Sequence, residues 1–198
     1  MSFDHNIALL LDKNSEESVI DLSERFSKEF NSTLKLDRRG VLPHLSLYLT
    51  SFSQEAVSFI RQNLLILTEK DGAVRTASCD VKPNNRGLIM LGVQKTKKLC
   101  NLHNQILLEF KNLREERSDT WHKGDRKYTK KEQLYLDLYG YPYALDLWKP
   151  HITIAKVPRD RVKQAISTLE ASQLDLIFSR IVIGQVGVSG TLRNVVGD

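Results

Sequence analysis

The chain has 198 residues, enough for one compact domain or for two closely packed lobes. Its hydrophobic share of 41% and charged share of 27% are typical of a folded globular protein and exclude a disordered or low-complexity chain. The net charge of +5 favours an anionic partner, although an excess of this size also serves solubility alone. No stretch approaches the ~20 apolar residues of a membrane span, so we expect a cytoplasmic protein with no membrane partner.

The first half of the chain predicts alternating strands and helices. The expected elements are a strand at 6–11, a helix at 15–30, a strand at 41–50, a helix at 53–70 and a strand at 73–82. In the first helix Val19, Leu22 and Phe26 recur at helical spacing. Ser53 is placed to cap the second helix and Gly72 to end it.

The second half repeats this order of elements. The expected elements are a strand at 86–94, a helix at 96–113, a strand at 151–157, a helix at 158–172 and a strand at 174–188. The repeat predicts a single bilobal α+β domain over 1–198, in which two lobes are related by a pseudo-two-fold axis. Their approximate bounds are 1–84 and 85–198, and the second lobe carries an insertion at about 114–148.

One motif occurs in both halves, as LPHLSLYL at 42–49 and KPHITIAK at 149–156. Side chains of a strand alternate between faces, so His44 and Ser46 share one face, as do His151 and Thr153. Equivalent strands of two symmetric lobes meet at the lobe interface, a common position for a cleft. If the polar faces line that cleft, two imidazoles and two hydroxyls converge on a space that could hold a small anion.

This set of side chains suits the hydrolysis of a phosphodiester. Imidazole titrates near neutrality, so one of His44 and His151 could act as general base and the other as general acid. Ser46 and Thr153 could donate hydrogen bonds to the non-bridging phosphate oxygens. No metal or cofactor is expected, because a zinc site built on the two histidines would lack a third ligand beside either motif.

A plainer interpretation stands beside this one, because a histidine at a strand edge is usually only a satisfied polar residue. Two copies of the motif, each after a proline and each at the same place in the repeat, make coincidence a minor alternative. The remaining histidines, His5, His103 and His122, are expected to be surface or partly packed residues and not catalytic ones. Cys79 and Cys100 are isolated, so neither a disulfide framework nor a cysteine metal site is indicated.

The paired motifs resemble those of the 2H phosphoesterase superfamily, named for two His-x-Ser/Thr-x (HxTx) motifs. Here they are the stretches His44–Leu47 and His151–Ile154. The resemblance implies a bilobal α+β fold in which two mainly antiparallel sheets line a central cleft, with helices outside. The family includes 2′-5′ RNA ligase-like proteins and cyclic nucleotide phosphodiesterases.

The resemblance also implies an activity: metal-independent phosphodiester hydrolysis by His44 and His151, with phosphate bound by Ser46 and Thr153. The expected substrate is an RNA, an oligonucleotide or a cyclic nucleotide with a 2′,3′-cyclic phosphate or a 2′,5′ linkage. The alternative is a nucleotide- or RNA-binding module on the same fold without turnover. No obligate protein partner is inferred.

The insertion at 114–148 holds five of the six tyrosines, both tryptophans and a basic cluster that spans 123–131. Basic residues interleaved with aromatic rings suit single-stranded nucleic acid, which would make the insertion a lid over the cleft. The alternative is a partly helical surface segment on which Leu134, Leu136 and Leu138 pack down. Strand alternation puts Lys156 on the face opposite His151 unless a bulge intervenes.

Overall fold

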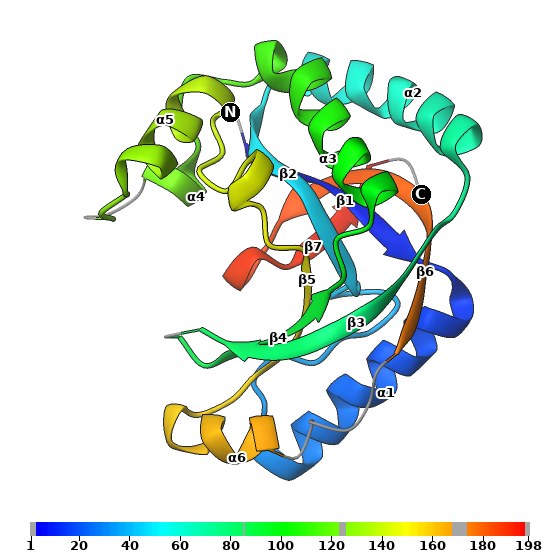
Figure 1. Cartoon of the computed structure of the whole chain (residues 1–198), viewed down its shortest axis with the longest axis vertical. Helices are drawn as coiled ribbons and strands as arrows, with labels where there is room; N and C mark the ends of the chain where they lie inside the picture. Colours follow the sequence, from blue (N-terminus) through cyan, green and yellow to red (C-terminus); the bar gives the residue numbers. More distant parts are fainter. Residues whose placement is uncertain (1–2, 85, 123–125, 168–173, 197–198) are drawn as a thin grey trace.

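The computed structural model describes residues 3–84, 86–122, 126–167 and 174–196 (Figure 1). Its strands are β1 (Phe3–Leu11), β2 (His44–Phe52), β3 (Val74–Pro83), β4 (Leu88–Val93), β5 (His151–Lys156), β6 (Asp175–Val186) and β7 (Leu192–Val195). Its helices are α1 (Lys13–Phe30), α2 (Gln54–Asp71), α3 (Lys97–Phe110), α4 (Asp119–His122), α5 (Lys130–Tyr139) and α6 (Val162–Ser167). The short 3-10 turns are η1 (Lys111–Leu113), η2 (Leu145–Leu147), η3 (Arg159–Arg161) and η4 (Val188–Gly190).

The main elements form where the sequence predicts them, and local signals fix several of their ends. The Ser53 side chain accepts a hydrogen bond from the backbone of Ala56 and so caps α2, while Gly72 ends this helix at φ 60°. The last predicted helix begins later than expected, in α6, and the part of that prediction at 168–172 lies outside the described residues.

All strand pairs are antiparallel and follow the path β2-β1-β6-β3-β4-β5, with β7 on β6. In the described part of the chain the two expected sheets are joined into one seven-stranded antiparallel sheet, because β3 pairs with strands of both. The first part of β3, Val74–Ala77, pairs with β6, whereas its second part, Ser78–Pro83, pairs with β4. We call β2, β1, β6 and β7 the first sheet, and β3, β4 and β5 the second sheet.

The two halves of the chain exchange elements in space. Strand β3 comes from the first half but pairs with β4, while β6 comes from the second half and pairs with β1. The helices cross over as well, since α1 packs against β5 and α3 against β2 (Figure 1). The approximate boundary at residue 84 therefore falls between two paired strands and does not separate two independent sheets.

A repeated bulge makes the pseudo-two-fold relation visible in the hydrogen-bond register. The β1–β2 register shifts after Ser46, so Leu47 has no partner on β1. The β4–β5 register shifts after Thr153 in the same way, so Ile154 has no partner on β4. Both unpaired residues hold the fourth position of their motif, and the second bulge brings Lys156 back to the face of His151.

The apolar sides of the two motif strands face one shared core. Its members from these strands include the fully buried Leu45, Leu47, Ile152 and Ile154. Burying a leucine or isoleucine stabilises the fold by roughly 1.5–3 kcal/mol, so the pairing of the two halves is anchored beneath the motifs. A second, smaller apolar cluster lies on the other face of the first sheet and contains Ala8, Leu10, Val182 and Leu192.

The insertion covers the free edge of β2, and its role as a nucleic-acid lid stays a prediction. Its two tryptophans and Tyr141 are buried, and its other tyrosines are half-buried. The Trp121 indole donates to the carbonyl of Leu49, and the Tyr48 hydroxyl donates to the carbonyl of Tyr139. An edge strand needs such cover because its backbone polar groups lack a neighbouring strand.

The leucines of α5 differ in one detail from the expectation that the insertion is a surface segment with three packed leucines. Leu136 is buried as expected, but Leu134 and Leu138 are each 51% exposed, because only one face of this short helix meets the rest of the protein. Of the predicted basic cluster, Lys123 lies outside the described residues. None of the helices within the described ranges combines the length and the hydropathy that a membrane span requires.

Candidate active site

Each motif histidine lies at the start of an edge strand and is oriented by its own backbone. The Nδ1 atom of His44 lies 2.9 Å from the carbonyl oxygen of Leu42, and that of His151 lies 2.8 Å from the carbonyl of Lys149. A carbonyl only accepts, so Nδ1 of His151 carries a hydrogen and its Nε2 remains available to a substrate, whereas His44 has a second backbone partner in Gly190. The duplicated proline explains this geometry, because the residue before a proline is held extended and its carbonyl stays in place.

The structure brings the two histidines together at the seam between its two sheets. Strands β2 and β5 lie at opposite ends of the strand path, yet their Cα atoms approach within 8 Å (Figure 1). The imidazoles are close enough that positive charge on His151 lowers the pKa of His44. The arrangement therefore places both imidazoles at one seam, with Nε2 free in His151 and a second backbone hydrogen bond, to Gly190, in His44.

A clamp of two rings holds this seam. The Trp148 indole, just before β5, donates to the carbonyl of Ser46 at 3.0 Å, and His103 of α3 donates from Nδ1 to the carbonyl of Leu47 at 2.8 Å. The two rings stack with centroids 4.1 Å apart, and His103 Nε2 accepts from the backbone of Leu145. The bulge at Leu47 turns these carbonyls toward the clamp.

The prediction that His103 lies at the surface or only partly packed is wrong, since it is 1% exposed. Burial lowers its pKa to about 4, and both nitrogens have partners, so it is a neutral structural residue. Its apolar helix face was visible in the sequence, but its contact with β2 depends on the crossing of α3 between the two halves. His5 is also buried, next to Phe52, whereas His122 is half-buried in the insertion.

Burial favours the neutral form of both motif histidines. His44 is 8% exposed, and burial lowers its pKa to about 4 against the raising effect of hydrogen bonds to the backbone of Leu42 and Gly190. Burial also lowers the pKa of the half-buried His151, opposed by the carbonyl of Lys149. A neutral imidazole can accept a proton, and an anionic group at the seam would raise both pKa values and help to supply the general acid.

The two motif hydroxyls differ in their surroundings. The Ser46 Oγ accepts a hydrogen bond of 2.7 Å from the amide of Asn6, which leaves the serine hydrogen free to donate. Thr153 is half-buried and its hydroxyl has no hydrogen-bond partner among the residues that the structure describes. Asn6 was missed as a site residue, although it begins the otherwise apolar run at 6–11.

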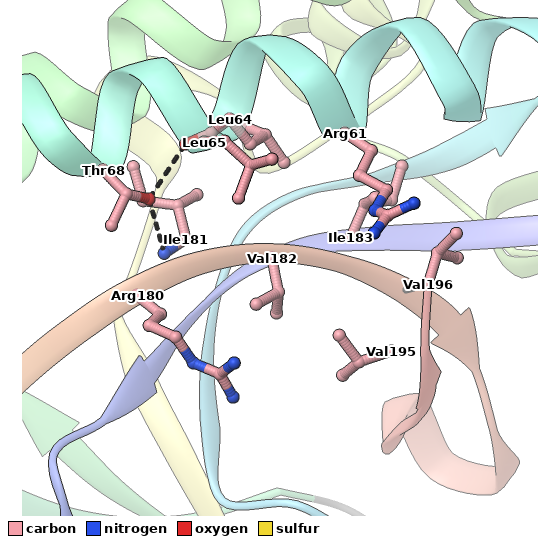
Figure 2. A pocket seen from close by; sticks show the side chains of 10 residues that line it. All are labelled: Arg61, Leu64, Leu65, Thr68, Arg180, Ile181, Val182, Ile183, Val195 and Val196. Atoms are coloured by element: carbon pink, nitrogen blue, oxygen red, sulfur yellow. Dashed lines mark hydrogen bonds between the residues drawn. The ribbon is translucent and has the colours of Figure 1, made fainter. Parts of the chain in front are cut away.

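No cluster of three or more His, Cys, Asp or Glu side chains suited to a metal ion occurs in the described part of the chain. A hollow of about 90 Å³ lies away from the histidines, between α2 and β6, where Thr68 links the helix to the backbone of Ile181 (Figure 2). Arg180, Val182 and Val195 point from β6 and β7 to the side away from α2 (Figure 2). The hollow therefore sits behind the face that carries His44.

Comparison with known proteins places the chain in a family. Residues 53–192 match the model of DUF1045, described as a protein of unknown function, and no curated protein matches. The crystal structure of E. coli LigT in its apo form is similar with a TM-score of 0.50 and 12% identity, over 99% of this chain and 93% of that one. A crystal structure titled as a phosphoesterase is similar with a TM-score of 0.47 and 12% identity, over 98% and 95% of the two chains. The chain thus belongs to the DUF1045 family, and its fold is the 2H phosphoesterase fold that LigT has.

Proposed function

We propose that the protein is a metal-independent phosphodiesterase in which His44 and His151 form the acid–base pair. The observation that carries this proposal is the approach of the two imidazoles at the seam, where Nδ1 of each faces a backbone carbonyl and Nε2 of His151 is left free. General acid–base catalysis needs two such groups on opposite sides of the reacting phosphorus. The 2H phosphoesterase fold supports the same chemistry by analogy.

The proton balance of the reaction uses one histidine for each oxygen. The base takes a proton at Nε2 from the attacking water, whose oxygen forms a bond to phosphorus. The bond from phosphorus to the leaving oxygen breaks, and the acid gives that oxygen its Nε2 proton. Ser46 and Thr153 donate hydrogen bonds to the non-bridging oxygens, where negative charge grows in the transition state.

The proposed substrate is RNA-like: a 2′,3′-cyclic phosphate at a nucleotide or RNA end, or a 2′,5′ linkage. The net charge of +5 favours such an anionic ligand. A nucleotide- or RNA-binding module without turnover is the second candidate. The near-complete burial of His44 favours this second candidate, because substrate reaches the His44 imidazole only if the chain around Gly190 moves away.

The test is hydrolysis of a short RNA with a 2′,3′-cyclic phosphate end in the presence of EDTA. Wild type is compared with His44→Ala, His151→Ala and the matched control His122→Ala, whose histidine lies in the insertion. We expect each motif variant to lose about 10²–10⁴ in kcat with a much smaller change in substrate affinity, while the control keeps wild-type activity. Binding without turnover on this substrate and on 2′,5′-linked oligonucleotides would overturn the enzyme proposal in favour of the binding module.

A further inference from the structure

The second sheet carries an ion pair on the same face as His151 and Thr153. Gly92 of β4 pairs with His151 and Met90 with Thr153, and Met90 pairs on its other side with Lys82 of β3. Directly opposite residues of neighbouring strands point to the same face. Lys82 therefore lies on the face of Thr153, two strands away, which is about 10 Å at the usual spacing between strands.

Gly92 makes room for the second member of the pair. A Cβ atom at this position would lie 2.3 Å from Oδ1 of Asp80 and 2.9 Å from the sulfur of Cys79. The Asp80 carboxylate thus rests on β4 where a side chain would otherwise stand, next to the strand of His151. Its other oxygen lies 2.9 Å from the Lys82 ammonium.

The equivalent face of the first sheet also carries a cation, since Leu10 of β1 pairs with both His44 and Arg180, but the residues next to Ser46 are apolar. There the neighbours of Ser46 are Ala8 on β1 and Val182 on β6, and both belong to the small apolar cluster. Leu192 of β7 completes this cluster without any exposure and bridges to the segment before His44. The cluster fills the face beside Ser46, whereas the Lys82 and Asp80 side chains are 63% and 48% exposed.

Lys82 can change partner at little cost. An exposed ion pair contributes only about 0–1 kcal/mol, so exchange of the Asp80 carboxylate for a phosphate loses little. Asp80 raises the pKa of Lys82, so the lysine stays charged. A lysine ammonium on the same face as a proposed phosphate site favours ligands with a second negative group.

We propose that the substrate extends from the seam over the second sheet and that Lys82 binds a further phosphate of the same molecule. The inference rests on the proposed function and narrows its substrate class. The preferred substrate carries a second phosphate, as in a nucleoside 5′-phosphate 2′,3′-cyclic phosphate or an RNA end, and a nucleoside 2′,3′-cyclic phosphate alone is a poor one.

The experiment compares a nucleoside 2′,3′-cyclic phosphate with its 5′-phosphorylated form. For wild type, Lys82→Met, Asp80→Asn and Lys163→Met, the ratio of kcat/KM for the two compounds is measured at low salt. Lys163 is the matched control, since it is exposed on α6, which packs against β3. We expect wild type and Lys163→Met to prefer the 5′-phosphorylated compound about tenfold, Lys82→Met to lose that preference, and Asp80→Asn to increase it.

A second readout separates this inference from the proposed function. The affinity of each compound for the His151→Ala protein is measured by calorimetry, with and without Lys82→Met. If neither compound is turned over but their binding depends on Lys82, the phosphodiesterase proposal is overturned and the subsite is kept. Turnover without preference, or a preference that survives Lys82→Met in both readouts, would overturn the subsite and keep the enzyme. Failure of both compounds to bind would overturn the subsite.

Discussion

The two motif strands have the same backbone plan and different surroundings. Both begin with a histidine whose Nδ1 is held by a carbonyl two residues earlier, and both bulge at the fourth motif position. His44 is buried in contact with the Gly190 backbone beside an apolar cluster, whereas His151 is half-buried beside an open face with charges. A duplicated scaffold can thus set two identical side chains in unlike environments, which is what distinct acid and base roles require.

The largest expected effect is the loss of kcat when either motif histidine is removed, and it shows whether the two histidines act as one unit. His44→Ala and His151→Ala are each expected to lower kcat by about 10²–10⁴, and the double variant is expected to be no slower than the worse single variant by more than a small factor. The reason is that removal of either group already abolishes concerted proton transfer. Single-turnover rates would decide this, and losses that multiply in the double variant would show that the histidines act separately.

The clamp that joins the halves can be broken without touching either motif histidine. His103→Ala leaves the carbonyl of Leu47 and the backbone N–H of Leu145 without partners and opens a cavity beside Trp148. We expect a loss of about 3 kcal/mol in the free energy of unfolding, measured by urea denaturation. The exposed Leu138→Ala is the control and should change stability by less than about 0.5 kcal/mol. Equal effects of the two substitutions would contradict the clamp.

The pH dependence of the unfolding free energy tests the burial of His44 and His103. The pKa values of His44 and His103 are lowered to about 4, so below pH 6.5 the unfolded chain takes up protons that the folded chain excludes. Stability should therefore fall as the pH drops from 6.5 to about 4, by up to about 1.4 kcal/mol per pH unit for each histidine. Urea midpoints measured across this range for wild type and His103→Gln check this, and the variant should show a shallower decline. A stability that is flat over this range would contradict the burial of both rings.

The smallest expected effect is on kcat, when the hydrogen bond from Asn6 to the Ser46 hydroxyl is removed. Asn6→Ala removes the donor that orients Ser46, and we expect kcat to fall about five- to tenfold with little change in KM, in line with ~1 kcal/mol for one hydrogen bond. Asn101→Ala, at the exposed surface of α3, is the control and should have wild-type kinetics. A fall in unfolding stability with unchanged kcat would show that Asn6 has only a structural role.

Local patterns in the sequence carry most of the element order and the identity of the motif residues. Helical spacing of Val19, Leu22 and Phe26 predicts α1, and the capping of α2 by Ser53 is confirmed. The role of the insertion could not be predicted in the same way, because a packed aromatic segment and an exposed nucleic-acid platform contain the same residue types. Only the free edge of β2 decides that these rings pack inward and donate to its carbonyls.

Strand alternation and the proline restriction act within a few residues, so the amino-acid order alone specifies two α+β repeats, two proline-histidine strands and the four side chains that share their polar faces. Long-range packing decides which strands pair across the halves, how deeply each histidine is buried, and that Asn6, His103 and Trp148 support the seam. The bulges at Leu47 and Ile154 belong to this second group, since they depend on the partner strand. These features arise from contacts between segments far apart in the chain, which no local pattern encodes.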